Sequence, residues 1–231
     1  MAIALNGTSQ YMRVVNNATF NITPAVTLMG WVNTTNTSLA SSMQRIVSRY
    51  LSGATANEQY GIDIYQGMPR MLIGTTTAVT AATGTSMVTA GQWMHICGTY
   101  DGSNMMLYQD ANLVGTMARS GTITSSTGVL SVGADYNGST GTEFFQGQLE
   151  DIRIYNRALS QGEIETIYTC RGTGLIRNGM ILNLLLDEQR AGATLAASAV
   201  VYDTGPFKLN ATNIVAGTAF TAGFLRKRRF S

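Results

Sequence analysis

The sequence predicts an all-β fold of antiparallel strands, closed either as a two-sheet sandwich or as a barrel. Charged residues make up only 12% of the 231 residues, and Gly, Thr, Ser and Asn take their place. That composition is typical of short strands joined by many turns. Strand and turn signals also alternate about every 8 to 15 residues. Hydrophobic residues reach 45%, which excludes a wholly disordered chain.

Strand signals follow one another along most of the chain. Residues 60–65 alternate apolar and polar side chains, the pattern of a half-buried strand. Asp101-Gly102 and Asn137-Gly138 are turn signals. We expect Trp31 and Trp93 to bury large aromatic surfaces. The predicted strands are residues 26–32, 60–65, 93–100, 105–109 and 151–155.

One short helix is predicted over residues 161–168. Ser160 and Glu163 form a capping box, in which each side chain accepts a hydrogen bond from the other residue's backbone N–H. Ile164, Ile167 and Tyr168 then follow at the spacing of one apolar helix face. The helix therefore begins after Ser160 and packs one side against the body of the fold.

The order of several motifs resembles that of laminin-G-like domains in the concanavalin A-like lectin/glucanase superfamily. The most specific run is Arg-x-Tyr-Asn-Arg-Ala-Leu-Ser at residues 153–160. The resemblance covers residues 2 to about 169 and implies a jelly roll, which is a sandwich of two curved antiparallel sheets. Within it, we expect Arg153 and Arg157 to satisfy loop carbonyls and acids. The other motifs are residues 5–11, 26–32, 45–49, 91–96, 99–102, 107–110 and 147–152.

This organisation divides the chain into a laminin-G-like sandwich at residues 1–169 and a C-terminal extension at 170–231. Within the extension, residues 180–186 resemble the opening strand of such domains, although they follow the sandwich here. They either fold back as a displaced strand or pair with a neighbouring subunit. We favour folding back, because an exposed apolar strand would aggregate. Residues 226–231 form a basic tail.

Catalytic groups are scarce, so the sequence predicts a protein that is not an enzyme. Glycosidases of this fold need paired carboxylates on one face of a strand. Glu58 and Asp63 are five residues apart, which places them on opposite faces of an ideal strand. His95 is the single histidine, and we expect it to be structural. Cys97 lies in an apolar run, which favours a buried free thiol.

Two kinds of ligand site have candidate residues, and no other cofactor is expected. Some members of the resembled superfamily bind Ca²⁺ at the rim of the sandwich, and the candidates here are Asp101, Asp110 and Asp135, unless these aspartates only cap turns. A glycan site needs an exposed aromatic ring beside polar loops. Its candidates are Tyr100, Tyr136 and Phe144, unless cross-strand packing explains these rings.

The basic tail is the strongest charge feature of the chain. Arg226, Lys227, Arg228 and Arg229 account for four of the 15 cations, so the rest of the chain carries 11 cations against 13 acids. The tail is either a solvated end or an anchor that pairs with acids on a partner protein. Nucleic-acid binding is not favoured, because no companion basic face or interleaved aromatic residues accompany it.

Two functions fit these features. The first is a non-catalytic structural protein on the surface of a phage virion, as a capsid decoration, cement or tail-associated component. Laminin-G-like domains occur in phage virion proteins, and a Leu-Leu-Leu-Asp-Glu segment before a basic end resembles hypothetical proteins of that kind. Its partners would be capsid or tail proteins and further copies of itself.

The alternative is a lectin-like, carbohydrate-binding adhesion module that contacts cell-surface glycans. The chain shows no secretory signal, so we expect synthesis in a host cytoplasm and location in the virion. Membrane insertion is not expected, since apolar runs such as residues 181–186 are far shorter than the roughly 20 residues that span a bilayer.

Overall fold

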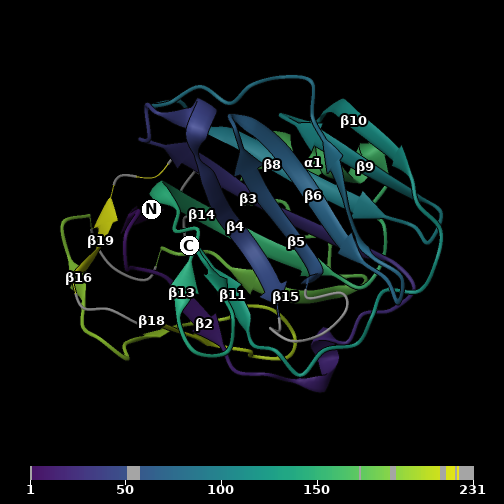
Figure 1. Cartoon of the computed structure of the whole chain (residues 1–231). Helices are drawn as coiled ribbons and strands as arrows, with labels where there is room; N and C mark the ends of the chain where they lie inside the picture. Colours follow the sequence, from purple (N-terminus) through teal and green to yellow (C-terminus); the bar gives the residue numbers. More distant parts are fainter. Residues whose placement is uncertain are drawn as a thin grey trace.

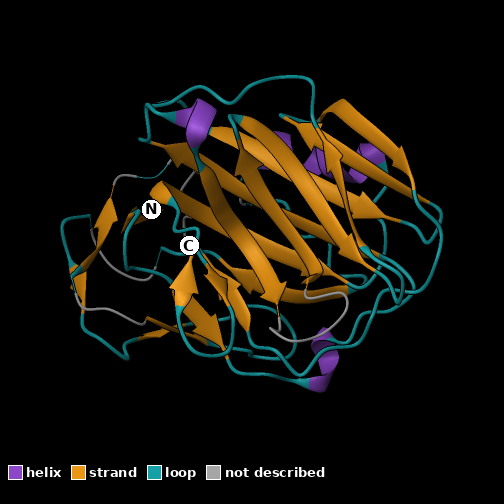
Figure 2. Ribbon diagram, in the orientation of Figure 1, coloured by secondary structure: helices purple, strands orange, loops and turns teal. Residues whose placement is uncertain are grey.

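The computed structural model describes residues 2–50, 58–171, 173–187, 191–213, 217–221 and 223. Two large antiparallel sheets, called sheet A and sheet B here, lie face to face in two layers (Figures 1 and 2). This confirms the predicted two-sheet sandwich and rules out a single closed barrel. No described helix is long and apolar enough to cross a membrane.

Sheet A contains the strands that carry most of the sequence signals. In the described chain its order is β10-β9-β8-β3-β14-β1-β19-β16, with β15 also paired to β14. Its strands are β1 (Ala2–Asn6), β3 (Val26–Thr34), β8 (Met94–Tyr100), β9 (Asn104–Gln109), β10 (Asn112–Ala118), β14 (Gln146–Tyr155), β15 (Met180–Leu184), β16 (Thr194–Leu195) and β19 (Thr218–Thr221).

Sheet B has the order β17-β18-β2-β11-β4-β5-β6-β7. Its strands are β2 (Met12–Val14), β4 (Met43–Tyr50), β5 (Glu58–Tyr65), β6 (Met68–Gly74), β7 (Val79–Thr83), β11 (Leu130–Val132), β17 (Val200–Val201) and β18 (Ala211–Asn213). A separate hairpin is made by β12 (Asp135–Tyr136) and β13 (Gly141–Thr142). Two short 3₁₀ helices lie at Ala18–Phe20 and Leu39–Ser41.

The C-terminal extension contributes strands to both sheets. β15 pairs with the second half of β14, where Ile152 lies opposite Leu184, while β1 pairs with the first half, where Ile3 lies opposite Leu149. Between the two halves, Asp151 has a positive φ of 53° and the β14 register shifts. β19 then pairs with β1, and β18 pairs with β2. The described part of the extension is thus built into the sandwich.

The core lies between the sheets and consists of inward aliphatic and aromatic side chains. Leu28, Ile62, Ile96 and Leu182 are all fully buried in it. Burial of each such side chain stabilises the fold by about 1.5–3 kcal/mol. The expectation that Trp93 is buried is wrong in part. This residue directly precedes β8 and is only half-buried.

Helix α1 (Gln161–Cys170) covers the outer face of sheet A and ends two residues beyond the predicted end. Both hydrogen bonds of the predicted capping box are present. Ile164 and Ile167 are fully buried, and the ring of Tyr168 stacks on Trp31 with 5.5 Å between ring centroids. Beneath the helix, His95 and Cys97 are buried as predicted.

Candidate functional site

The outer face of sheet B carries a row of charged side chains in register. Arg45 of β4 lies opposite Asp63 of β5, which lies opposite Arg70 of β6. One step along the strands, Ser48 lies opposite Gly61 and also opposite Ser131 of β11. Since inward residues such as Ile62 fill the core, these alternate positions must face outward.

Two β-bulges decide which carboxylates share this face. In β4, Ile46 is an extra residue with no partner in β5. In β5, Gln59 is an extra residue with no partner in β4. The extra residue at Gln59 reverses the alternation, so Glu58 lies on the same face as Asp63. The expectation that Glu58 and Asp63 point apart is therefore wrong, because it assumed an unbroken strand.

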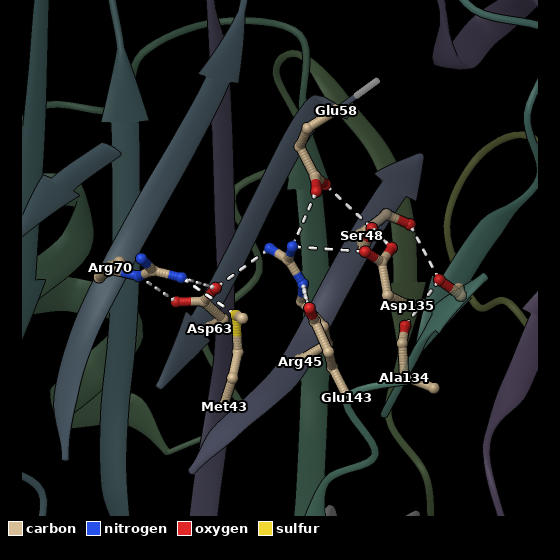
Figure 3. Close-up of polar contacts among 10 residues, drawn as sticks. Met43, Arg45, Ser48, Glu58, Asp63, Arg70, Ala134, Asp135 and Glu143 are labelled. Atoms are coloured by element: carbon tan, nitrogen blue, oxygen red, sulfur yellow. Dashed lines mark hydrogen bonds and ion pairs between the residues drawn. The ribbon is translucent and has the colours of Figure 1, made fainter. Parts of the chain in front are cut away.

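Arg45 is the centre of a buried ion-pair network (Figure 3). Its guanidinium lies 3.2 Å from Glu58, 3.0 Å from Asp63, 3.3 Å from Asp135 and 2.6 Å from Glu143, measured between nitrogen and oxygen atoms. Arg70 adds a second cation on Asp63, at 2.7 Å. We call these six residues together with Ser48 the Arg45 network.

One carboxyl group of the network has a raised pKa. Burial is the largest cause that raises the pKa of Glu58 to about 8, against the opposing attraction of Arg45. The Ser48 Oγ lies 2.9 Å from Glu58 Oε1 and 2.6 Å from Asp135 Oδ1. Ser48 is the donor in both contacts, so its single hydroxyl proton is shared between the Glu58 and Asp135 carboxyl groups.

Close approach at the network depends on a glycine. A Cβ atom at Gly61 would lie 2.6 Å from Glu58 Oε1 and 3.1 Å from the Val47 carbonyl oxygen. Any larger residue would push the Glu58 carboxyl away from Ser48. Arg45 and Ser48 are not among the site residues predicted from sequence, although both lie in the motif at residues 45–49.

The β12–β13 hairpin joins the Arg45 network to a group of aromatic side chains. Asp135 and Glu143 reach Arg45, while their neighbours Tyr136 and Phe144 turn toward Tyr11. The ring centroid of Tyr11 lies 6.2 Å from that of Tyr136 and 5.8 Å from that of Phe144.

Arg13 of β2 completes this group, since its guanidinium carbon lies 4.6 Å from the centroid of the Tyr136 ring. We call Tyr11, Arg13, Tyr136 and Phe144 the rim cluster. Tyr136 and Phe144 each remain partly exposed, while Tyr11 is buried beneath them. The structure thus brings together two of the three predicted glycan contacts, and adds Tyr11 and Arg13, which no sequence pattern predicted.

The third predicted glycan contact, Tyr100, does not belong to this surface. It is 0% exposed, and its hydroxyl donates to the Gly121 carbonyl oxygen. Its ring faces the core, so it has no surface on which a sugar could stack. The prediction for Tyr100 is wrong because the alternation of β8 points it inward.

The three predicted Ca²⁺ ligands lie in separate surroundings. Asp101 caps the β8–β9 turn by accepting from the backbone N–H groups of Ser103 and Asn104. Asp110 accepts from the backbone N–H of His95, and Asp135 belongs to the Arg45 network. Within the described residues no group of three or more His, Cys, Asp or Glu side chains is arranged to hold a metal ion. The basic residues 226–229 lie outside the described residues.

Comparisons with known proteins agree with this architecture. A family model described as concanavalin A-like lectin/glucanases superfamily matches residues 6–165. No curated protein matches the sequence.

Among solved structures, a candidate carbohydrate binding protein from Bacteroides ovatus superposes with a TM-score of 0.70 at 15% identity, over 96% of this chain and 61% of that one. The chain thus spans less than two thirds of that protein. A heptameric SAP-like pentraxin from Limulus polyphemus gives 0.61 at 18%, over 94% and 95%. The CBM40 of a Ruminococcus gnavus IT-sialidase, bound to α2,3 sialyllactose, gives 0.59 at 17%, over 72% and 96%.

Proposed function

Because the chain belongs to the concanavalin A-like lectin/glucanase superfamily, we propose that it is a non-catalytic module that binds glycans through the rim cluster. One observation carries the proposal: the β12–β13 hairpin places the partly exposed rings of Tyr136 and Phe144 together beside an immobilised charged network. Aromatic rings supply a flat apolar surface for a sugar face, and fixed neighbours lower the entropy lost on binding.

The rim cluster is held in place before any ligand arrives. The Tyr136 hydroxyl donates to the Gly138 carbonyl oxygen, and Asn137 accepts from the backbone N–H groups of Ser139 and Thr140. A Cβ atom at Gly141 would lie 2.9 Å from the Phe144 ring and 3.0 Å from that of Tyr11. Gly141 is therefore required for these rings to pack against the hairpin.

The Arg45 network supports the rim cluster and does not perform acid–base chemistry in this proposal. Glu58 has a pKa suited to a general acid, but only 2% of its surface is exposed. Ser48 and Arg45 both contact its carboxyl group, and Arg45 also pairs with the neighbouring carboxylates. Two bacterial proteins of similar fold, one a candidate carbohydrate binding protein and the other a CBM40 bound to sialyllactose, support a binding role.

A glycan array followed by calorimetric titration of the strongest hit tests this function. We expect Tyr136→Ala and Phe144→Ala each to weaken binding by about ten-fold or more, since each removes a stacking surface. Phe207→Ala is the matched control, because Phe207 is 48% exposed and lies outside the rim cluster. An array with no signal above background, or equal affinity in all variants, contradicts the proposal. Repeating the titration with EDTA tests whether Ca²⁺ takes part.

The virion location predicted from sequence is proposed separately, as a place where such a module could act. Its support is the basic tail, for which arginine side chains could pair bidentately with acids of a partner. The experiment is co-sedimentation with the particle before and after deletion of residues 226–231. We expect weaker attachment after deletion, and undiminished attachment removes the anchoring role from the tail.

A further inference from the structure

A cavity of about 210 Å³ lies on the C-terminal extension, away from the rim cluster. Its walls come from the segment before β15 and from the loop between β17 and β18. Leu175, Met180 and Pro206 provide an apolar part, and Arg177 and Lys208 provide two cations. No residue of the rim cluster or of the Arg45 network lines it.

The loop that forms one wall is fixed by a buried carboxylate. Asp203 is 2% exposed, and its oxygens accept from the backbone N–H groups of Asn183 at 2.8 Å, Gly205 at 2.7 Å and Leu209 at 2.8 Å. Hydrogen bonds to a charged acceptor are about twice as strong as neutral ones. The wall is therefore preorganised for a ligand.

A glycine permits this arrangement at the cavity floor. A Cβ atom at Gly205 would lie 2.7 Å from Asp203 Oδ1 and 3.2 Å from the Asn183 nitrogen. With glycine here, the backbone itself lines the cavity and Asp203 stays beneath it, bonded to three amides. Those amides stabilise the buried charge of Asp203.

The two cations of the cavity have no competing partner in the described chain. Arg177 and Lys208 are exposed, and neither side chain forms an ion pair or hydrogen bond with a described residue. They contrast with Arg45, Arg70, Arg153 and Arg157, which are all engaged by acids. Among the described residues, none that lines the cavity carries a carboxylate. The site therefore offers unused positive charge at the edge of an apolar surface.

We propose that this cavity binds a small organic anion, in which a carboxylate is attached to a compact body with an apolar face, as in an acidic monosaccharide unit. The guanidinium of Arg177 matches a carboxylate bidentately, and Lys208 adds a point charge. Leu175, Met180 and Pro206 would contact the apolar face of the ligand, which an inorganic anion lacks. The cavity is below the size of about 300–1,000 Å³ typical of larger ligands, which limits the occupant to about one sugar unit.

The test is an NMR titration of the ¹⁵N-labelled full chain with D-glucuronate, D-glucose and inorganic phosphate. We expect glucuronate to shift the amide signals of Gly205 and Leu175, and glucose to leave them unchanged. Arg177→Gln and Lys208→Gln should each weaken glucuronate binding by about ten-fold, and Lys208→Arg should retain it. Arg171→Gln is a matched control from the same extension, outside the cavity lining.

Three outcomes overturn the proposal: no shifts with glucuronate, equal binding by the Arg177→Gln/Lys208→Gln double variant, or phosphate binding as tight as glucuronate. The last would show a simple anion site without use of the apolar wall. The inference does not rest on glycan binding at the rim cluster, so Tyr136→Ala should leave the Gly205 shifts unchanged. The failure of either site can thus be distinguished from failure of the other.

Discussion

The two outer faces of the sandwich solve the same problem in different ways. Strand alternation sends every second side chain away from the core on both sheets. On sheet A, helix α1 covers these side chains, and Ile164 and Ile167 pack on Met29 and Tyr155 in a second apolar cluster. On sheet B the outward residues near β4 and β5 are charged, and the acidic side chains pair with Arg45 and Arg70. One face is thus stabilised by apolar packing under a helix, and the other by ion pairs between buried charged side chains.

The largest expected effect is at the centre of the charged face. Arg45→Ala leaves Glu58, Asp63, Asp135 and Glu143 without their shared cation, and we expect a loss of about 3–5 kcal/mol in the free energy of unfolding. Urea denaturation measures it. Arg70→Ala, which removes a cation with a single acidic partner, should cost clearly less. Equal losses in the two variants would show that Arg45 is not the centre of the network.

The face under α1 should depend strongly on apolar packing. Ile167→Ala leaves a cavity at a fully buried position on the inner side of α1. It should lower the free energy of unfolding by about 2–4 kcal/mol, by the same measurement. Thr166→Ala, its exposed neighbour on the helix, should change stability by less than about 0.5 kcal/mol. A similar cost at both positions would mean that α1 does not act as a cover for sheet A.

The two faces should respond to pH with opposite signs. Burial lowers the pKa of His95 to about 4 from 6.5, so between these values the unfolded chain binds the extra proton and stability rises with pH. The pKa of Glu58 is raised to about 8 from 4.5, so there the folded chain holds the extra proton and stability falls as pH rises.

Between pH 6.5 and 8, Glu58 contributes to the pH dependence and His95 does not. The free energy of unfolding should fall there by up to about 1.4 kcal/mol per pH unit. Glu58→Gln should remove this fall, as measured by urea unfolding at a series of pH values. A fall that persists unchanged in Glu58→Gln must come from another group.

The smallest effect concerns the start of the covering helix. Ser160→Ala removes the side chain that accepts from the Glu163 backbone N–H, and we expect a cost of about 1 kcal/mol. Ser160→Asp keeps an acceptor and should retain most of the stability. A null effect in Ser160→Ala would show that the partly buried Arg157–Glu163 pair fixes this helix end without the cap.

The sequence by itself determined the features that depend on neighbours along the chain. The capping box at Ser160 is local, and so is the alternation that predicts the strands containing Leu28, Ile62 and Ile154. The motif at residues 153–160 also identified Arg153 and Arg157 correctly as structural. Arg153 binds Asp151 and the Gly174 carbonyl oxygen, and Arg157 binds Glu163 and that of Asn178.

Only the tertiary structure decided which polar residues meet. Glu58 joins Asp63 because a bulge at Gln59 shifts the alternation, and a bulge arises from pairing with another strand. Tyr136 meets Tyr11 across more than a hundred residues of sequence, and spacing carries no signal of that contact. The rim cluster and the cavity beside Arg177 both depend on long-range packing. Residue types alone could therefore identify candidate aromatic side chains, but could not show which of them lie on the same surface.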